Sequence, residues 1–417
     1  MLVRLATVRR KLGATTPGKI LGQMIVVSAL AGLLAVGSVL VGLAAASSAN
    51  SIQNNHAALI VSARTVQTEL ARANAAAAAT LLDGSDDWDV QRNDYDEALR
   101  AGAQALESAI AAAPDDDEAL HEQLAVLTAA VPRYTGLIEA ARANNRQGFP
   151  AGAAYLDEAT ALLETEIFPL TDSLANQAAT SYRSEYDRHQ GPISVAVGLL
   201  IMATLMLLWY LLRTQIWMAR WFRRTVNPAV LATTVVVAGA LLVNILLFVS
   251  SWAGLKEARE EGYDVLRQYL DIRTNSLAAR ADESRFLIAR GAGESFEITF
   301  RQRADLVESA LASEGPEAAT SVSQWNEYRT HHERVVALAR QGEHSTAVDE
   351  ASDAGRRFVA FDEQIQELAA NRRLHLEDQT ASVANNWRLL SLIGPILAVI
   401  AAALALWGLQ QRRAEYR

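Results

Sequence analysis

The 417-residue chain contains no cysteine. This absence excludes disulfide frameworks, cysteine-based zinc sites, iron–sulfur clusters and thiol nucleophiles. Basic residues are also in deficit, because 38 Lys and Arg stand against 47 Asp and Glu, for a net charge of −9. A general nucleic-acid binder carries a basic domain or patch, so we expect no nucleic-acid partner.

Motifs that carry chemistry are missing as well. The sequence has no Gly-rich phosphate loop, nucleophile elbow, kinase signature or zinc-protease motif. We therefore expect a protein that is not an enzyme and that needs no cofactor.

Four long runs lack any Asp, Glu, Lys, Arg or His, namely residues 20–46, 191–212, 229–252 and 389–409. About 20 apolar helical residues cross a bilayer, and one charge at the centre would cost about 2.5–3.5 kcal/mol. The runs therefore predict four transmembrane helices in the lipid bilayer. The first run exceeds the 7–15 apolar residues typical of a secretory signal, which favours an uncleaved anchor.

Charge is sharply segregated between the intervening segments. Residues 1–19, 213–228 and 410–417 together carry 12 basic residues and one acidic residue, whereas 47–190 and 253–388 have net charges of −13 and −7. Lys and Arg concentrate on the cytoplasmic side of membrane proteins. The pattern predicts a multi-pass plasma-membrane protein with a cytoplasmic N-terminus, loop and tail, and two large extracytoplasmic segments.

The order of span, large segment and returning span occurs twice, which suggests an internal duplication. Residues 134–175 align with 328–369 without gaps and share nine identities, including Tyr134 with Tyr328. The tripeptide ArgGlnGly occurs at 146–148 and again at 340–342.

Both large segments have the apolar periodicity of long helices. Breaks are predicted near Asp83–Ser85, Pro114 and Gly148–Pro150, and near Gly291–Gly293, Gly315–Pro316 and Gly342. Three breaks make four helices in each segment. The predicted fold is an all-α membrane protein with four transmembrane helices and two tandem extracytoplasmic four-helix bundles, like a duplicated chemoreceptor sensor. The apolar stripes are Ile52, His56, Leu59, Ala63, Val66, Leu70, Ala73 and Ala77, and Ala347, Ala351, Ala354, Phe358, Phe361, Ile365 and Leu368.

Two local features refine this picture. Pro114 and the acids that follow it, Asp115 to Glu118, are typical of a helix start. Pro169 lies inside the last helix of the first bundle, where we expect a lost backbone hydrogen bond and a kink.

Two groups of residues resemble metal ligands in spacing, but neither pattern predicts a metal site. An EF-hand-like spacing of Asp83, Ser85, Asp87, Asp89 and Asp94 has Trp88 where the loop needs glycine. The alternative there is a solvated acidic turn. His331, His332 and Glu333 lack a second ligand cluster, and Glu327 is one turn before His331 as an ordinary helix pair.

Two groups of residues are candidates for binding a partner. The basic loop mixes aromatic and basic side chains, which suits either anchoring at an anionic membrane surface or docking of a soluble signalling protein. Polar residues continue the second apolar stripe and form either a signal-transmitting joint or a helix whose buried face rotates. His56 is either a packed histidine or a pH-sensitive group. The loop group is Arg213, Trp217, Arg220, Trp221, Arg223 and Arg224, and the stripe group is Arg372, His375 and Gln379.

The cytoplasmic pieces are too short to form a catalytic domain, so any output requires a partner. The layout, with its repeated Tyr-to-ArgGlnGly pattern, resembles the actinobacterial GlnX membrane proteins. That resemblance implies a signal relay that senses extracytoplasmic amino acids through a solute-binding lipoprotein (GlnH) and acts on a cytoplasmic Ser/Thr kinase (PknG). A direct solute-sensing receptor and a structural cell-envelope assembly protein remain as alternatives.

Overall fold

The computed structural model describes residues 16–51, 57–82, 88–147, 150–222, 227–257 and 263–414. These residues contain helices and short connections and no strand. His56, Asp83, Ser85, Asp87, Arg223 and Arg224, named above as candidates, lie outside the described residues. The chain divides into two compact units, here called the span unit (Met1–Ser51, Ser184–Ala258 and Asp378–Arg417) and the bundle unit (Ile52–Arg183 and Arg259–Glu377).

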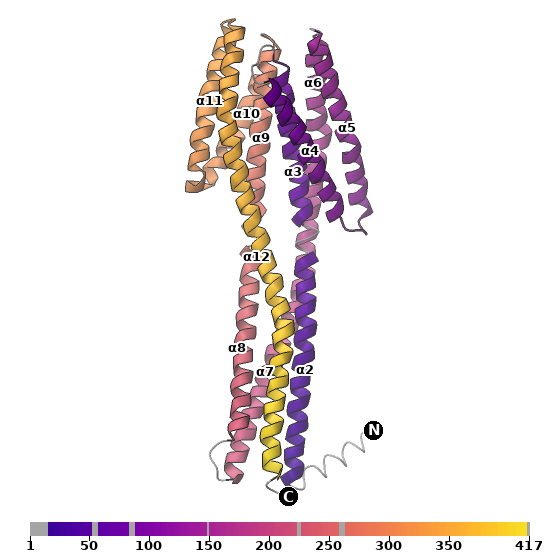
Figure 1. Cartoon of the computed structure of the whole chain (residues 1–417), viewed down its shortest axis with the longest axis vertical. Helices are drawn as coiled ribbons and strands as arrows, with labels where there is room; N and C mark the ends of the chain where they lie inside the picture. The colour runs from indigo at the N-terminus through magenta and orange to yellow at the C-terminus, as the bar shows by residue number, and fades with distance from the viewer. Residues whose placement is uncertain are drawn as a thin grey trace. The chain divides into compact units, whose positions relative to one another are not determined.

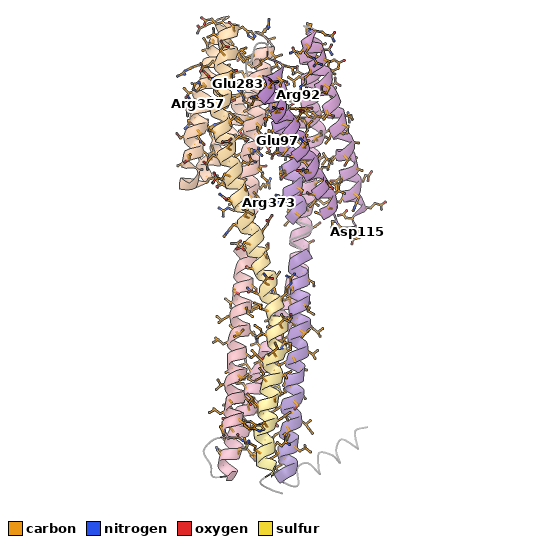
Figure 2. All side chains as sticks on the ribbon, viewed as in Figure 1. Arg92, Glu97, Asp115, Glu283, Arg357 and Arg373 are labelled. Atoms are coloured by element: carbon orange, nitrogen blue, oxygen red, sulfur yellow. The ribbon has the colours of Figure 1, made fainter. Side chains whose placement is uncertain are left out.

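The span unit is built from α2 (Thr16–Ser51), the later part of α7 (Phe168–Phe222), α8 (Pro228–Glu257) and the later part of α12 (His344–Ala414). Each of these helices is long and apolar enough to cross a membrane. Large apolar side chains such as Leu40, Val195 and Val235 are exposed on them, as lipid-facing residues are. Figure 2 shows side chains projecting from the outer sides of these helices. The predicted all-α fold with four membrane-spanning helices is confirmed.

Close packing inside the span unit depends on small residues. A Cβ atom added at Gly42 of α2 would lie 2.7 Å from the carbonyl oxygen of Trp387 on α12, so glycine lets the two backbones approach. Asn244, the conspicuous polar residue of α8, donates its amide to the Ala240 carbonyl of its own helix at 2.6 Å.

The basic segment predicted at 213–228 is helical in its first part. α7 continues as helix to Phe222, and α8 begins at Pro228. Residues 213–222 contain neither glycine nor proline, so nothing in their local sequence stops the helix before that point.

The first half of the bundle unit, here called bundle 1, contains α3 (Ala58–Thr80), α4 (Trp88–Ala112), α5 (Glu118–Arg146), α6 (Ala151–Leu162), the π-helical turn η2 (Leu163–Ile167) and the start of α7. They are drawn in indigo to magenta in Figure 1. The predicted break at Pro114 lies between α4 and α5. The other two, Asp83–Ser85 and Gly148–Pro150, fall wholly or partly outside the described residues, after the ends of α3 and α5. Asp117 caps α5 by accepting the Leu120 amide at 3.1 Å, as the Pro–acid pattern predicts.

Pro169 is two residues after the end of η2 and lies in the first turn of α7. A proline ring clashes with the carbonyl four residues earlier and cannot donate a hydrogen bond. A π-turn, with its wider hydrogen-bond ring, absorbs this defect. The irregularity predicted at Pro169 is therefore found in the turn before it.

The second half, bundle 2, contains α9 (Tyr263–Ile288), α10 (Glu294–Ser313), the 3₁₀ turn η4 (Gly315–Ala318), α11 (Ala319–Arg340) and the start of α12. The three breaks predicted for this segment are found between its helices. Gly291, Gly315 and Gly342 have φ values of 96°, 69° and 83°, which glycine adopts without the steric penalty of a side chain.

The two cores differ in composition but share equivalent positions. Tyr134 of α5 and Tyr328 of α11, paired by the repeat, are both fully buried. In bundle 1 the alanine-rich α3 packs closely on α4, whereas in bundle 2 aromatic rings contact one another, with the Trp325 and Phe361 centroids 5.1 Å apart. The described members of the first predicted stripe, from Leu59 to Ala77, are buried.

Candidate functional site between the two helical bundles

Helices α3 and α9 form the seam that joins bundle 1 to bundle 2. The hydroxyls of Thr68 and Thr274 are 2.9 Å apart across it. Arg273 of α9 donates to Glu69 of bundle 1 at 2.7 Å, and to both carboxylate oxygens of Asp362 in bundle 2 at 2.8 and 3.1 Å. One buried guanidinium therefore binds carboxylates from both bundles.

The electrostatics of this arginine follow from its partners. Burial alone would lower the pKa of Arg273, but the carboxylates of Asp362 and Glu69 raise it above its ordinary value. Arg273 and Glu69 have side chains only 5% and 7% exposed. A buried charge of this kind is tolerated only when its partners stay in place, so these contacts stabilise the arrangement of the seam that the structure shows.

A polar cavity of about 380 Å³ opens on one face of the seam, lined by residues of α3, η2, α7, α9 and α10. Its most buried charged group is Arg64 of α3, whose Nη1 donates to Gln67 at 2.9 Å and contacts the carboxylates of Asp172 and Asp271. Burial raises the pKa of Asp271, while the Arg64 guanidinium opposes that shift. The cavity therefore combines contacts from both bundles.

Ion pairs beside the cavity also cross between bundles. Arg303 of α10 pairs with Glu164 of η2 and, at 2.8 Å, with Asp282 of its own bundle. Arg285 donates to Asp157 of α6 at 3.0 Å. Burial raises the pKa of Asp282 to about 6, although Arg303 and Arg285 both oppose the shift.

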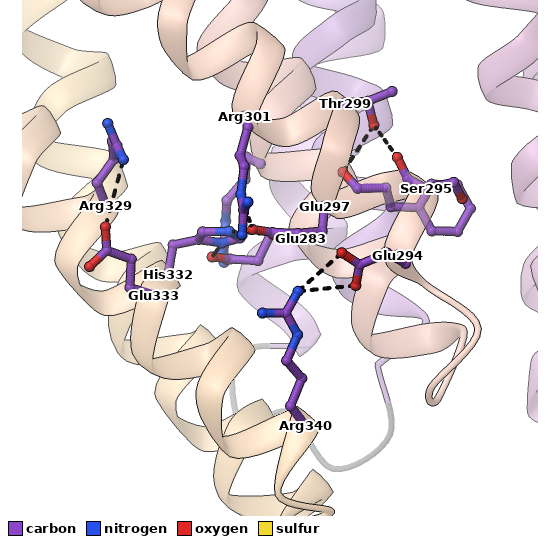
Figure 3. Close-up of polar contacts among 12 residues, drawn as sticks. Glu283, Glu294, Ser295, Glu297, Thr299, Arg301, Arg329, His332, Glu333 and Arg340 are labelled. Carbon is purple, nitrogen blue, oxygen red and sulfur yellow. Dashed lines mark hydrogen bonds and ion pairs between the residues drawn. The ribbon is translucent and has the colours of Figure 1, made fainter.

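A separate charged cluster lies in the core of bundle 2 (Figure 3). His332 of α11 is held between Glu283 of α9 and Glu297 of α10, with N···O distances of 2.7 and 2.9 Å, and its ring stacks on Phe300 with centroids 3.4 Å apart. Burial alone would lower the pKa of His332, but the hydrogen bonds to the two carboxylates raise it. The geometry is that of a buried imidazolium bridging two helices.

Neither metal hypothesis gains support from these contacts. His331 pairs with Glu350 at 2.6 Å, away from the partners of His332, and Glu327 pairs with Arg357 at 2.9 Å rather than with His331 as predicted. Within the described ranges, no group of three His, Asp or Glu residues is arranged to hold a metal ion. Of the calcium candidates that are described, Asp94 is paired with Arg72 and Asp89 is exposed.

The predicted loop residues are described only in part. Arg213 and Arg220 are exposed at the end of α7, and Trp217 is half-buried. The Arg213 guanidinium lies over the Trp209 ring, 5.4 Å from its centroid. Trp221 belongs to α7, but its side chain lies outside the described set, as do Arg223 and Arg224.

For the stripe group on α12, the structure agrees with one of the two alternatives, a helix whose buried face rotates. Ala369 and Leu376 are buried, whereas Leu368 is half-buried and His375 is exposed. The prediction used steps averaging 3.5 residues, but an α-helix has 3.6 per turn, so the buried face drifts. Arg372 and Gln379 are half-buried, and the three residues do not form one continuous buried stripe.

The charged residues of the seam and the cavity were not predicted from the sequence. One signal could have revealed them: Arg273 and Arg280 are seven residues apart on α9, on the face that a bundle helix buries. Charges at such positions are either paired or functional.

Comparison with known proteins adds one match. Residues 48–187 match the family model of the actinobacterial sensor domain. No curated protein and no solved structure matches the chain. The matched residues span bundle 1 from α3 to the bundle-unit part of α7. Bundle 1 is thus similar to an actinobacterial sensor domain, which supports a sensing or signalling role for this membrane protein.

Proposed function

We propose that this protein is a transmembrane signal relay that senses amino-acid availability outside the cell. The observation that carries the proposal is the pairing of α3 with α9, in which Arg273 binds Glu69 and Asp362. Two bundles paired in this way resemble a dimeric sensor contained in one chain. The sensor-domain match of bundle 1 and the four apolar helices support the same reading.

The orientation follows from charge. We propose that both termini and the 213–228 segment are cytoplasmic and that both bundles are extracytoplasmic, because the basic residues concentrate in the former. Because the chain has no cysteine, single cysteines can be introduced without removing native ones. A membrane-impermeant maleimide should label Asp115→Cys in intact cells and should label Arg220→Cys only after permeabilisation. The reverse pattern would overturn the orientation.

Signalling in this scheme is a shift between two arrangements of the paired bundles. A ligand moves such an equilibrium only by its difference in affinity for the two states. A change from 1:99 to 99:1 needs about 5.5 kcal/mol. A solute-binding lipoprotein that docks only when loaded can supply that difference.

Output is proposed to pass to a cytoplasmic Ser/Thr kinase, since this chain is proposed to have no catalytic activity of its own. The exposed Arg213 and Arg220, with the half-buried Trp217 between them, offer cations and an aromatic ring to a protein or lipid surface. The amino-acid stimulus, the lipoprotein and the kinase are expected from the resemblance to the GlnX proteins.

The test is crosslinking of the tagged protein in native membranes, with and without added amino acids, followed by mass spectrometry. Recovery of a solute-binding lipoprotein and a kinase, with yields that change with amino acids, supports the relay. Recovery of envelope-assembly proteins instead, together with kinase phosphorylation that ignores deletion of the chain, would favour the structural alternative.

A further inference from the structure

Arg64, which lines the cavity beside the α3–α9 seam, uses its guanidinium group differently from Arg273. Arg273 engages two carboxylates through Nε, Nη1 and Nη2. Arg64 engages its partners through Nη1 alone, and its Nε is buried without a hydrogen-bond partner. The Arg64 side chain is only 7% exposed, so its planar fork carries unused donor capacity at the wall of a cavity.

Guanidinium N–H groups that have no hydrogen-bond partner can bind a carboxylate. Arg presents parallel N–H donors that match the two oxygens of a carboxylate. A buried donor without a partner carries a desolvation cost, and a ligand oxygen would remove that cost. The cavity volume of about 380 Å³ falls within the range of small-molecule sites.

The remaining charges of the wall restrict the class of ligand further. Arg64, Arg267 and Arg303 are balanced there by Glu164, Asp172 and Asp271. A ligand with only a negative charge would add uncompensated negative charge beside three carboxylates. A ligand with only a positive charge would leave the Arg64 Nε–H without a partner. A molecule with one carboxylate and one ammonium group satisfies both sets of partners.

Neutral polar groups complete the wall. The side-chain amides of Gln67, Asn176 and Asn275 line the cavity, with the Thr274 hydroxyl beside them. Such groups donate and accept hydrogen bonds, so they suit a short polar side chain. We infer that the cavity is a direct binding site for a small zwitterionic solute of the free amino-acid type, with the Arg64 guanidinium edge holding its carboxylate.

The site rests on one part of the proposed function, the sensing of amino acids, and deepens it by placing recognition of the solute in the chain itself instead of in a lipoprotein. Its wall is shared between bundle 1, through Arg64 and Asp172, and bundle 2, through Asp271 and Arg303. A solute bound between them contacts both bundles at once, so its binding energy depends on how the bundles are paired.

The test uses isothermal titration calorimetry of the full-length protein in lipid nanodiscs. The probe is L-asparagine, a zwitterion with an amide side chain. Its truncated analogues are succinamate, which lacks the ammonium group, and 3-aminopropanamide, which lacks the carboxylate. We expect saturable binding of L-asparagine, or of a component of a mixture of the twenty common amino acids, and at least about tenfold weaker binding when either charged group is removed.

Two variants tie the binding to the cavity. Arg64→Lys keeps a positive charge toward Asp172 and Asp271 but removes the guanidinium fork, and should weaken binding at least about tenfold. Ala278→Leu, at a cavity-lining position of α9, fills space without altering any charge and should have a similar effect. Ala312→Leu makes the same change at an exposed position of α10 outside the cavity and should bind like the wild type.

Each outcome decides the question. No saturable heat with L-asparagine or with the mixture up to about 10 mM overturns the site, as does unchanged binding in Ala278→Leu. The relay is judged separately, by amino-acid-dependent kinase phosphorylation in cells. Intact signalling without binding removes the cavity site and leaves the relay. Binding without any effect of the chain on phosphorylation keeps the site and removes the relay.

Discussion

The His332 cluster permits a quantitative test of how bundle 2 is held together. The repeat pairs His332 of α11 with Ile138 of α5, a fully buried apolar residue at the equivalent place in bundle 1. The substitution His332→Ile therefore introduces the residue that the same architecture already accommodates in its other copy. The substitution removes the imidazolium charge that lies between the carboxylates of Glu283 and Glu297.

The cost of that substitution can be worked from the contacts. Removing one partner of a buried ion pair costs about 3–5 kcal/mol, because the remaining charge stays buried. Glu283 keeps Arg280, and Glu297 keeps Arg301 at 2.7 Å, so we expect the lower end, about 3 kcal/mol. For a folded unit of this size, that loss lowers Tm by about 6–12 °C.

The pH dependence separates the charge from the packing. The pKa of His332 is raised in the folded protein above its ordinary value of 6.5. A raised histidine pKa contributes stability that is fully present below about pH 6.5 and is lost as pH rises through the folded pKa. The stability difference between wild type and His332→Ile should therefore be largest below about pH 6.5 and shrink on the alkaline side.

The matched control is Ile138→Ala in bundle 1. It removes buried apolar atoms at the equivalent position and should cost about 2–5 kcal/mol with no dependence on pH, because no titratable group changes. Unfolding of the full-length protein in nanodiscs, followed by hydrogen exchange of α5 and α11 peptides, measures both. A cost below about 1 kcal/mol for His332→Ile, or a difference that stays flat with pH, would refute the reasoning.

Three further predictions test the seam, the spans and the buried acid. Arg273→Met should cost about 3–5 kcal/mol and speed hydrogen exchange in α3 and α9 more than in α5; equal rates would contradict its role between the bundles. Gly42→Ala should destabilise the span unit by about 1–3 kcal/mol in thermal unfolding in detergent, whereas Gly32→Ala, with nothing within 4 Å of the added Cβ, should not. The pKa of Asp282 is raised to about 6, so wild-type stability should fall by up to about 3 kcal/mol as pH rises from about 4 to 6, and Asp282→Asn should abolish this component in pH-resolved denaturation.

Much of the fold follows from local chemistry. The spans can be predicted from the sequence because charged residues are excluded from them. The helix breaks in the described residues can be predicted because glycine, proline and capping acids act within a few residues. Asp117 illustrates this, since its cap contacts a backbone amide three residues away.

The candidate site could not be read in the same way. Arg273 and Glu69 are 204 residues apart, and no local pattern shows that α3 and α9 adjoin. Arg64 looks like an ordinary surface arginine until its helix is placed at the seam. On α12 the structure agrees with one of the two alternatives, a helix whose buried face rotates, since a tenth of a residue per turn exchanges His375 for Leu376 after several turns. A partner-binding role for these residues stays a prediction.

The pairing of α3 with α9 has a consequence for how such a sensor works at low abundance. Two separate chains associate by mass action and come apart when few copies are present. Here both halves are segments of one polypeptide, so their association is set by a fixed effective concentration and not by expression level. The halves are also free to diverge: a symmetric dimer would repeat every residue on both sides, whereas this chain sets Arg273 against Glu69 and builds a cavity around Arg64 with no second copy of either residue to accommodate.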